Sequence, residues 1–329
     1  MIWVTWRHHR TSLTISLGII AALAVTALIG GVVSEIMTTV IATLLPVLLG
    51  ALVGVTVFSR DIEQGTHVLG LTQSVSRARW FWMRVLVVFV PLSVAAALLG
   101  FVLEWTRAAD GGGSYVFVSG SGQLPDISNL TYPFFQSSGL ALGAYTFMAL
   151  VLGAALALMV RSSIGAMALT MVGVVVVLAV FQFVARPHYA PLSIEASPLD
   201  RSSSYALYTS DDVVPGIDWE IESGNADIRG NFVDVRYDEC SWTNLGSDAY
   251  EWKPDETDAQ YDERIEVLQE QEGRDMEVCL REQGVDHFET RYHSADQFHR
   301  FQLMEAALVL VLSGLILLRA LSALRRVKP

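Results

Sequence analysis

The sequence predicts an all-α polytopic membrane protein with six transmembrane helices and a small α+β extracytoplasmic domain between helices 5 and 6. Its 329 residues are 52% hydrophobic and only 17% charged, whereas about 25% of the residues in an ordinary soluble protein are charged. The apolar residues gather in long runs, while 27 of the 34 acidic residues lie between positions 186 and 302. One part of the chain is therefore suited to lipid and another part to water.

Six apolar runs are each long enough to cross about 30 Å of hydrocarbon, which takes about 20 residues. They lie at 13–30, 37–58, 81–103, 137–160, 164–184 and 303–324. The first five runs and their connections make up residues 13–185, and the sixth follows the acidic segment. Chains that fold in water rarely contain runs of this length, so the pattern favours a multi-pass membrane protein.

The Lys and Arg residues of short connections predict the orientation, because such residues accumulate on the cytoplasmic side. With six spans, both termini and the even-numbered connections share one side, and nine basic residues lie there. These are Arg7, Arg10, Arg60, Arg77, Arg79, Arg161, Arg325, Arg326 and Lys328. The opposite short connections carry only Arg107, in the predicted external loop 104–136. We therefore expect a plasma-membrane protein with cytoplasmic termini, including a tail at 325–329.

Residues 1–12 are expected to form a cytoplasmic interfacial segment. No small-residue cleavage site closes the following apolar run, which argues against a cleaved signal. Trp3 and Trp6 would share one helical face beside Arg7 and Arg10, as in a helix that lies in the membrane interface. Aromatic anchoring of the first span explains the two tryptophans equally well.

The segment 186–302 is predicted to be an extracytoplasmic domain with a net charge of −17, since it has only 10 of the 22 Lys and Arg. Alternating apolar residues predict a hairpin or short meander over 217–237. Helical spacing predicts a helix from about 258 to 283, with Gly284 as its C-cap. The carboxylates of the segment 186–302 are expected to keep the domain soluble, and recognition of a cationic ligand is the alternative.

Cys240 and Cys279 are the only two cysteines, and both lie in this predicted external domain. We expect a disulfide between them, because exported domains can keep such bonds; two unpaired buried thiols are the alternative. The histidines of this domain show no spacing typical of a zinc site. No metal or cofactor is therefore expected on this chain.

The chain lacks the motifs that would let it power or catalyse a reaction by itself. It has two lysines, Lys253 and Lys328, and neither follows a glycine, so it has no P-loop for ATP. The charges within the runs are Arg84, Glu305 and Arg319, each close to the end of its run. Glu305 could face a lateral cavity or be an ordinary interfacial carboxylate. The spans contain no paired carboxylates, and we expect no enzymatic activity.

Two GxxxG motifs, Gly50 to Gly54 and Gly139 to Gly143, lie within the second and fourth runs. Small residues at this spacing let helices approach closely in lipid. Packing between spans of one chain is the favoured explanation, and a dimer seam or substrate path is the alternative.

Three short segments carry a resemblance to a known family. The connection 59–80 reads SRDIEQGTHVLGLTQSVSRARW, the start at position 3 reads WVTWRHHR, and 291–306 reads RYHSADQFHRFQLMEA. The connection resembles the R-[ED]-x-E-x-G-T signature of the type-2 permease family of ABC transporters. All three segments are similar to its actinobacterial branch, although His8 replaces a usual Gln and Ser294 replaces a usual Pro.

The resemblance implies a cytoplasmic ABC ATPase subunit that binds ATP and Mg, together with a second permease copy, either identical or a paralogue. It also implies that 59–80 is the segment that couples the two kinds of subunit. The candidate coupling residues are Arg60, Asp61, Glu63, Gly65, Thr66, Gln73, Arg77 and Arg79. Anchoring by the positive-inside rule alone is the alternative for the three arginines.

The predicted function is that of the membrane-spanning permease subunit of an ATP-driven exporter, which moves an unidentified drug, peptide or lipid by alternating access. Membrane lipid is a further expected partner. Nucleic acid is not, because the chain has no basic patch interleaved with aromatic residues. The alternative function is a non-transporting membrane sensor or receptor whose external acidic domain binds a ligand.

Overall fold

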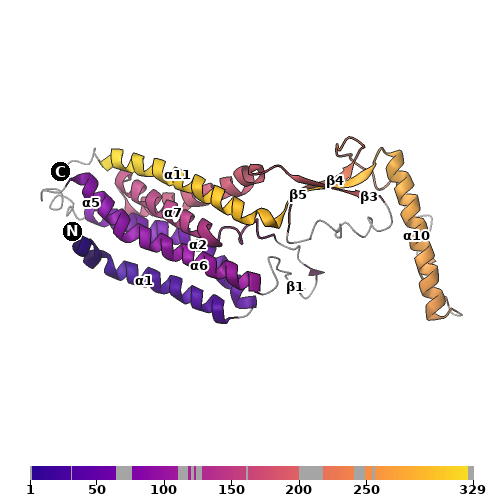
Figure 1. Cartoon of the computed structure of the whole chain (residues 1–329), viewed down its shortest axis with the longest axis horizontal. Helices are drawn as coiled ribbons and strands as arrows, with labels where there is room; N and C mark the ends of the chain where they lie inside the picture. The colour runs from indigo at the N-terminus through magenta and orange to yellow at the C-terminus, as the bar shows by residue number, and fades with distance from the viewer. Residues whose placement is uncertain are drawn as a thin grey trace. The chain divides into compact units, whose positions relative to one another are not determined.

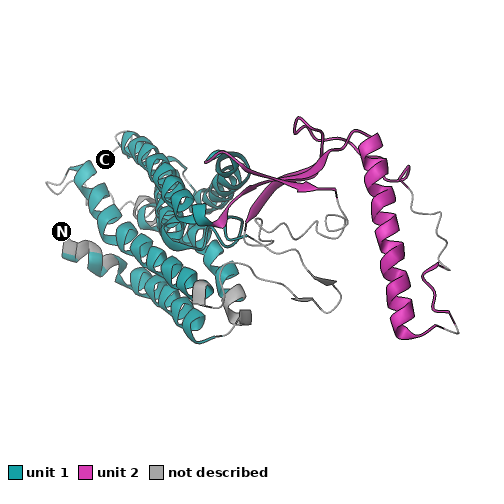
Figure 2. Ribbon diagram, turned by 45° about the vertical axis from the view of Figure 1, so that its right-hand side comes forward, with its two compact units in different colours: residues 1–114, 127–189, 296–329 teal, residues 115–126, 190–295 magenta. Residues whose placement is uncertain are grey.

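The computed structural model describes residues 2–30, 32–63, 76–109, 118–119, 122–123, 128–160, 162–199, 218–240, 249–253 and 256–324. The chain forms two compact units. The first, the helical unit, comprises residues 1–114, 127–189 and 296–329, and the second, the sheet unit, comprises 115–126 and 190–295 (Figure 2). The sequence predicted the boundaries of the external domain at 186 and 302. In the structure, Arg186 and Gln302 lie in the helical unit.

Within the described residues, six helical stretches are long and apolar enough to cross a membrane, as the sequence predicted. They are His9–Ile29, Met37–Ser59, Ala78–Arg107, Gly139–Met159, Ser163–His188 and Ala295–Leu324. The start of α1 and the end of α11 lie at the same end of this bundle (Figure 1), as six antiparallel spans require. These findings support a multi-pass membrane protein.

The described α-helices of the helical unit are α1 (Ile2–Ile29), α2 (Val32–Leu49), α3 (Val55–Glu63), α5 (Arg77–Arg84), α6 (Val90–Ala109), α7 (Gly139–Met159), α8 (Ser163–Val180) and α11 (Phe298–Leu324). Three π-helical turns interrupt the spans: η1 (Gly50–Gly54) joins α2 to α3, η2 (Val85–Phe89) joins α5 to α6, and η3 (Phe181–Ala185) follows α8. Such turns are often found at functional positions of helical proteins.

Helix α7 is the centre of the helical unit. In its most apolar window 72% of the residues are buried, whereas only 17% are buried in the corresponding window of the α8 span. Small residues make this burial feasible, because helices in lipid approach most closely where side chains are short. Exposed apolar side chains on α8, such as Ile164 and Val172, suit contact with lipid.

The glycines of both GxxxG motifs lie at contacts within this one chain. A Cβ at Gly50 would lie 2.8 Å from the Cβ of Ala149, and one at Gly54 would lie 2.7 Å from the carbonyl oxygen of Leu150, both on α7. A Cβ at Gly143 would lie 2.7 Å from that of Ala97 on α6. Gly139 has φ +40°, a conformation that favours glycine. These contacts pack helices of one chain against each other.

The sheet unit is built on a three-stranded antiparallel sheet in the order β3-β5-β4. The strands are β3 (Ser193–Pro198), β4 (Trp219–Ala226) and β5 (His287–His293). A further antiparallel pair joins β1 (Val118–Ser119) to β2 (Gly122–Gln123). Strand β4 falls within the predicted hairpin region, but its main partner is the distant β5, and the return after the Asp227 turn makes only an isolated bridge between Ala226 and Phe232.

Helix α10 (Asp258–Glu282) occupies the predicted helical region of the sheet unit. Gly284 follows it with φ +91°, as expected for a C-cap glycine. The end of α10 packs through Leu280 on a small core with Leu199, Cys240 and Val285. Cys240 and Cys279 form a disulfide with an S–S distance of 2.08 Å. Helix α11 begins after a 3₁₀ turn at Ala295–Gln297, a few residues before the predicted apolar run at 303–324.

Candidate functional site

A buried ion pair lies at one end of the helical unit. Arg186, in the 3₁₀ turn η4 (Arg186–His188) that ends the α8 span, donates from Nε and Nη2 to the two carboxylate oxygens of Glu305 on α11, at 2.9 and 2.7 Å. The side chains of both residues are 0% exposed. Charged groups inside a membrane protein are costly unless they are paired, so such a pair is by default a candidate functional site.

Arg186 is enclosed by further acceptors. Its Nη1 donates to the carbonyl oxygen of Leu130 at 2.8 Å and to Oε1 of Gln182 at 2.5 Å. The guanidinium lies over the ring of Phe135, 3.7 Å from the ring centroid, within the range of a cation–π interaction. Leu130 and Phe135 belong to the segment 128–138 that precedes α7, so this segment is held by the arginine.

Glu305 is held by two tyrosines as well as by Arg186. The hydroxyl of Tyr145 on α7 donates to Oε1 at 2.6 Å, and that of Tyr189 donates to Oε2 at 3.2 Å. Burial raises the pKa of Tyr189 above its ordinary value, and the Glu305 carboxylate raises it further. The Tyr189 hydroxyl therefore keeps its proton and remains a donor to the carboxylate.

Two glutamines extend the network around the ion pair. Gln302, one turn before Glu305, donates from Nε2 to the carbonyl oxygen of Phe135 and accepts the backbone N–H of Ala141, both at 3.0 Å. Gln136 donates from Nε2 to Oε1 of Gln182 at 3.0 Å. This network, which we call the Arg186 network, thus connects the end of the α8 span, the segment 128–138, α7 and α11.

The same end of the helical unit holds a second buried arginine. Arg107, at the end of α6, donates to the carbonyl oxygen of Phe134 at 3.2 Å and to Oγ of Ser138 at 2.5 Å. Nearby, Nδ1 of His299 lies 3.5 Å from Oε1 of Glu104. Arg107 and residues 128–136 were predicted to belong to the external loop 104–136. In the structure they are packed into the helical unit, with Phe134 and Phe135 fully or almost fully buried.

The predicted coupling segment is described only in part. Arg60, Asp61 and Glu63 lie on α3, and Arg77 and Arg79 lie on the first turn of α5, whose N-cap Ser76 accepts the backbone N–H of Arg79 at 3.3 Å. Gly65, Thr66 and Gln73 lie outside the described residues.

Helices α3 and α5 contact each other through aromatic and cationic side chains at positions 58 and 80–84. The Arg84 guanidinium lies 4.2 Å from the Trp80 ring centroid and 5.5 Å from that of Phe58. It also donates to the carbonyl oxygen of Val57. Phe58 and Phe81 stack with their ring centroids 5.2 Å apart. The two helices that flank the coupling segment are therefore held together.

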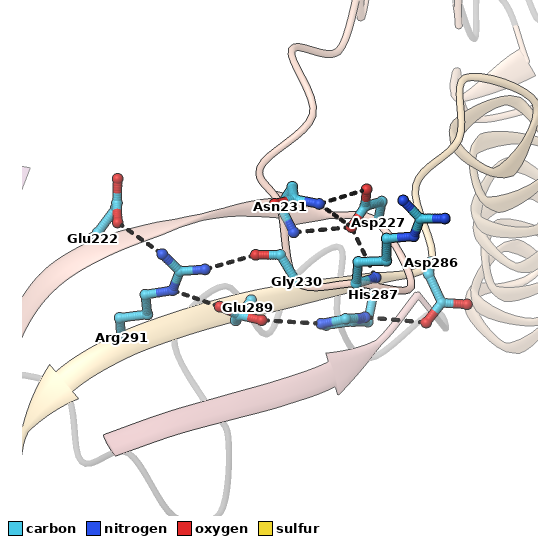
Figure 3. Close-up of polar contacts among 9 residues, drawn as sticks. Glu222, Asp227, Gly230, Asn231, Asp286, His287, Glu289 and Arg291 are labelled. Carbon is cyan, nitrogen blue, oxygen red and sulfur yellow. Dashed lines mark hydrogen bonds and ion pairs between the residues drawn. The ribbon is translucent and has the colours of Figure 1, made fainter. Parts of the chain in front are cut away.

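The sheet unit has its own polar cluster on β5 (Figure 3). Arg291 donates from Nε to Glu289 at 2.6 Å, from Nη2 to the carbonyl oxygen of Gly230 at 2.7 Å, and from Nη1 to Glu222 at 3.3 Å. His287 lies 3.4 Å from Glu289 and 3.1 Å from Asp286. The cluster ties the turn after β4 to β5. Its contacts are internal, which indicates a structural role.

Within the described residues, no group of three or more His, Cys, Asp or Glu side chains is arranged to hold a metal ion.

Sequence reasoning did not identify most of the Arg186 network. The sequence marks Glu305 as a charge within a span, but the predicted boundary at 186 places Arg186 in the external domain. No sequence pattern distinguishes Tyr145. The available signal was an arginine at the end of one span and a glutamate at the start of the next, since two such charges near one membrane face can pair.

Residues 30–186 match the model of a protein family described as ABC-2 membrane transporter related. The matched range is just under half of the chain; it includes three of the six candidate spans completely and a fourth as far as Arg186. Glu305 lies beyond it. No curated protein and no solved structure matches the chain significantly.

Proposed function

From this similarity we propose that the chain is the membrane-spanning permease subunit of an ATP-driven ABC exporter. The observation that carries the proposal is the match of residues 30–186 to an ABC-2 membrane transporter related family. Six helices that could cross a membrane agree with it. The substrate, a drug, peptide or lipid, is not identified by these features.

The proposed energy source is a separate cytoplasmic ABC ATPase subunit. The chain has no P-loop, because neither of its lysines follows a glycine. ATP and Mg would therefore bind the partner, and nucleotide-driven closure of the partner would be transmitted to the spans. A second permease copy, identical or a paralogue, would complete the complex.

In the proposed plasma-membrane topology, both termini and the coupling segment 59–80 face the cytoplasm, and residues 190–295 are extracytoplasmic. The distribution of Lys and Arg over the short connections supports this orientation. The contacts of Arg84 with Phe58 and Trp80 support a mechanical role for α3 and α5, because a segment anchored at both ends can transmit a displacement to the spans.

Coupling is tested by co-purification of the chain with a P-loop ATPase encoded beside it. We expect Glu63→Gln and Gly65→Val to reduce ATPase recovery at least roughly tenfold while the permease still inserts. The first removes a charge that basic groups of the partner could bind, and the second replaces the glycine of the family-like signature with a β-branched residue. Matched controls are Glu263→Gln, an exposed glutamate of α10, and Gly314→Val, where an added Cβ meets nothing within 4 Å.

Equal ATPase recovery with all four variants would contradict the assignment of 59–80 as the coupling segment. If no ATPase co-purifies with the unmodified chain, the permease proposal fails and the membrane sensor becomes the better explanation. If an ATPase does co-purify, substrates are sought among compounds that stimulate ATP hydrolysis by the reconstituted complex.

A further inference from the structure

We propose that the Arg186–Glu305 pair is a latch that opens and closes one end of the helical unit. In the closed form seen here, it holds the end of the α8 span against α7 and α11. In the open form, Arg186 separates from Glu305 and both groups become hydrated. This inference rests on the proposed function, because a permease that alternates between two states needs a seam that can open.

The position of the pair makes α8 the element that would move. Only 17% of the most apolar window of the α8 span is buried, compared with 72% for α7. The fully buried guanidinium of Arg186 makes contacts with α11 and with the segment 128–138. Arg186 is thus a main attachment of the end of the α8 span, beside the hydrogen bond from Gln136 to Gln182 and the ring contact of Phe181 with Tyr145.

The backbone beside Arg186 changes its helical geometry within a few residues. The α-helix α8 ends at Val180, the π-helical turn η3 spans Phe181–Ala185, and the 3₁₀ turn η4 begins at Arg186. Irregular turns interrupt the regular ladder of helical hydrogen bonds and often mark positions where a helix bends or changes its register. The latch therefore sits next to a natural hinge.

The chemistry of the pair favours reversible opening. A buried ion pair contributes about as much to stability as apolar side chains of similar volume, because desolvation offsets the attraction. An ionic contact and an apolar contact differ when they open: separated charges regain water, whereas separated apolar side chains expose hydrophobic surface. An ionic seam is therefore easier to open than an apolar one of equal closed-state stability.

The same reasoning predicts different effects for single and double substitutions. Glu305→Gln or Arg186→Gln leaves one buried charge without its partner, which destabilises the closed state strongly. We expect the ratio of separated to closed molecules to rise at least roughly tenfold. Replacement of both residues, Arg186→Met with Glu305→Leu, removes both charges. Tyr145 and Tyr189 lose their acceptor in this variant, so the closed state should be populated more than in either single variant.

The measurement is the distance between spin labels at His188→Cys and Leu303→Cys, two exposed positions beside the latch. It is made on the full chain in lipid nanodiscs by pulsed electron paramagnetic resonance. The native cysteines are joined in a disulfide and stay unlabelled without reductant. Arg300→Gln is the matched control, at an exposed arginine of α11; we expect it to leave the distance distribution unchanged.

Unchanged distributions in both single variants, or equal opening in the double variant, would overturn the latch. If the single variants do not fold, Arg186→Lys keeps the charge but loses the two-pronged geometry, and it should shift the distribution in the same direction by a smaller factor. No shift with Arg186→Lys would also count against the proposal. The measurement needs no ATPase, so its failure is distinct from that of the co-purification test.

Discussion

At the scale of single residues, the cost of an unpaired buried charge explains which groups come together in both units. In the helical unit, Glu305 receives four described hydrogen bonds, two from Arg186 and one each from Tyr145 and Tyr189. In the sheet unit, Glu289 is 4% exposed and is held by Arg291 and His287. A buried carboxylate is tolerated only when donors replace the water it has lost.

The pKa of Glu289 makes this arrangement testable by pH. Burial would raise that pKa, but the hydrogen bonds from Arg291 and His287, together with the charge of Arg291, hold it below its ordinary value. A carboxyl group whose pKa is lowered by folding stabilises the protein above its unfolded pKa, about 4.3 for glutamate, and loses that contribution as the pH falls through the folded value.

We therefore expect the melting temperature of the sheet unit to be nearly constant from pH 7 to about pH 5 and to fall below about pH 4. Glu289→Gln should lower the plateau and flatten this acid dependence. Scanning calorimetry of the full chain measures both effects, and Glu263→Gln, at an exposed position of α10, serves as the control. An identical acid dependence in Glu289→Gln and the unmodified chain would contradict the assigned role.

At the scale of elements, short side chains decide how the spans pack. The π-helical turn η1 lies against α7 through Gly50 and Gly54, which face Ala149 and Leu150, so the two backbones approach closely there. The GxxxG pattern in the sequence predicted close packing, but it could not identify the partner helix. The partner helix lies about 100 residues further along the chain, since Gly50 faces Ala149 and Gly54 faces Leu150, and only the folded arrangement reveals it.

Gly54→Ala tests this contact. The new Cβ would lie 2.7 Å from the carbonyl oxygen of Leu150 and 3.0 Å from its Cα, so the two helices must move apart. We expect a loss of about 1–3 kcal/mol in the free energy of unfolding, as for other overpacked sites, measured by thermal or denaturant unfolding in detergent. Gly18→Ala on α1, where a Cβ meets nothing within 4 Å, should have little effect. Equal effects of the two substitutions would show that the α7 contact is not tight.

At the scale of the whole chain, hydropathy predicted the six helices because a span is a local property of about 20 consecutive residues. The helix α10 and its C-cap glycine were predictable for the same reason. The pairing of β4 with β5 was not, since these strands are about 60 residues apart and alternation does not name a partner. The Arg186 network was missed likewise, because its two charges are 119 residues apart.

The orientation of the whole chain is predicted from the distribution of charge alone, and the prediction can be tested without an ATPase or a substrate. Ala78→Cys and Glu263→Cys place single thiols at exposed positions of the helical unit and the sheet unit. Basic residues near Ala78, including Arg79, should keep that end in the cytoplasm. A membrane-impermeant maleimide should therefore label the position 263 thiol in intact cells and the position 78 thiol only after permeabilisation. The unmodified chain, whose cysteines are joined in a disulfide, is the control. Labelling at position 78 in intact cells would reverse the proposed topology, and the coupling segment would then be unable to meet a cytoplasmic ATPase.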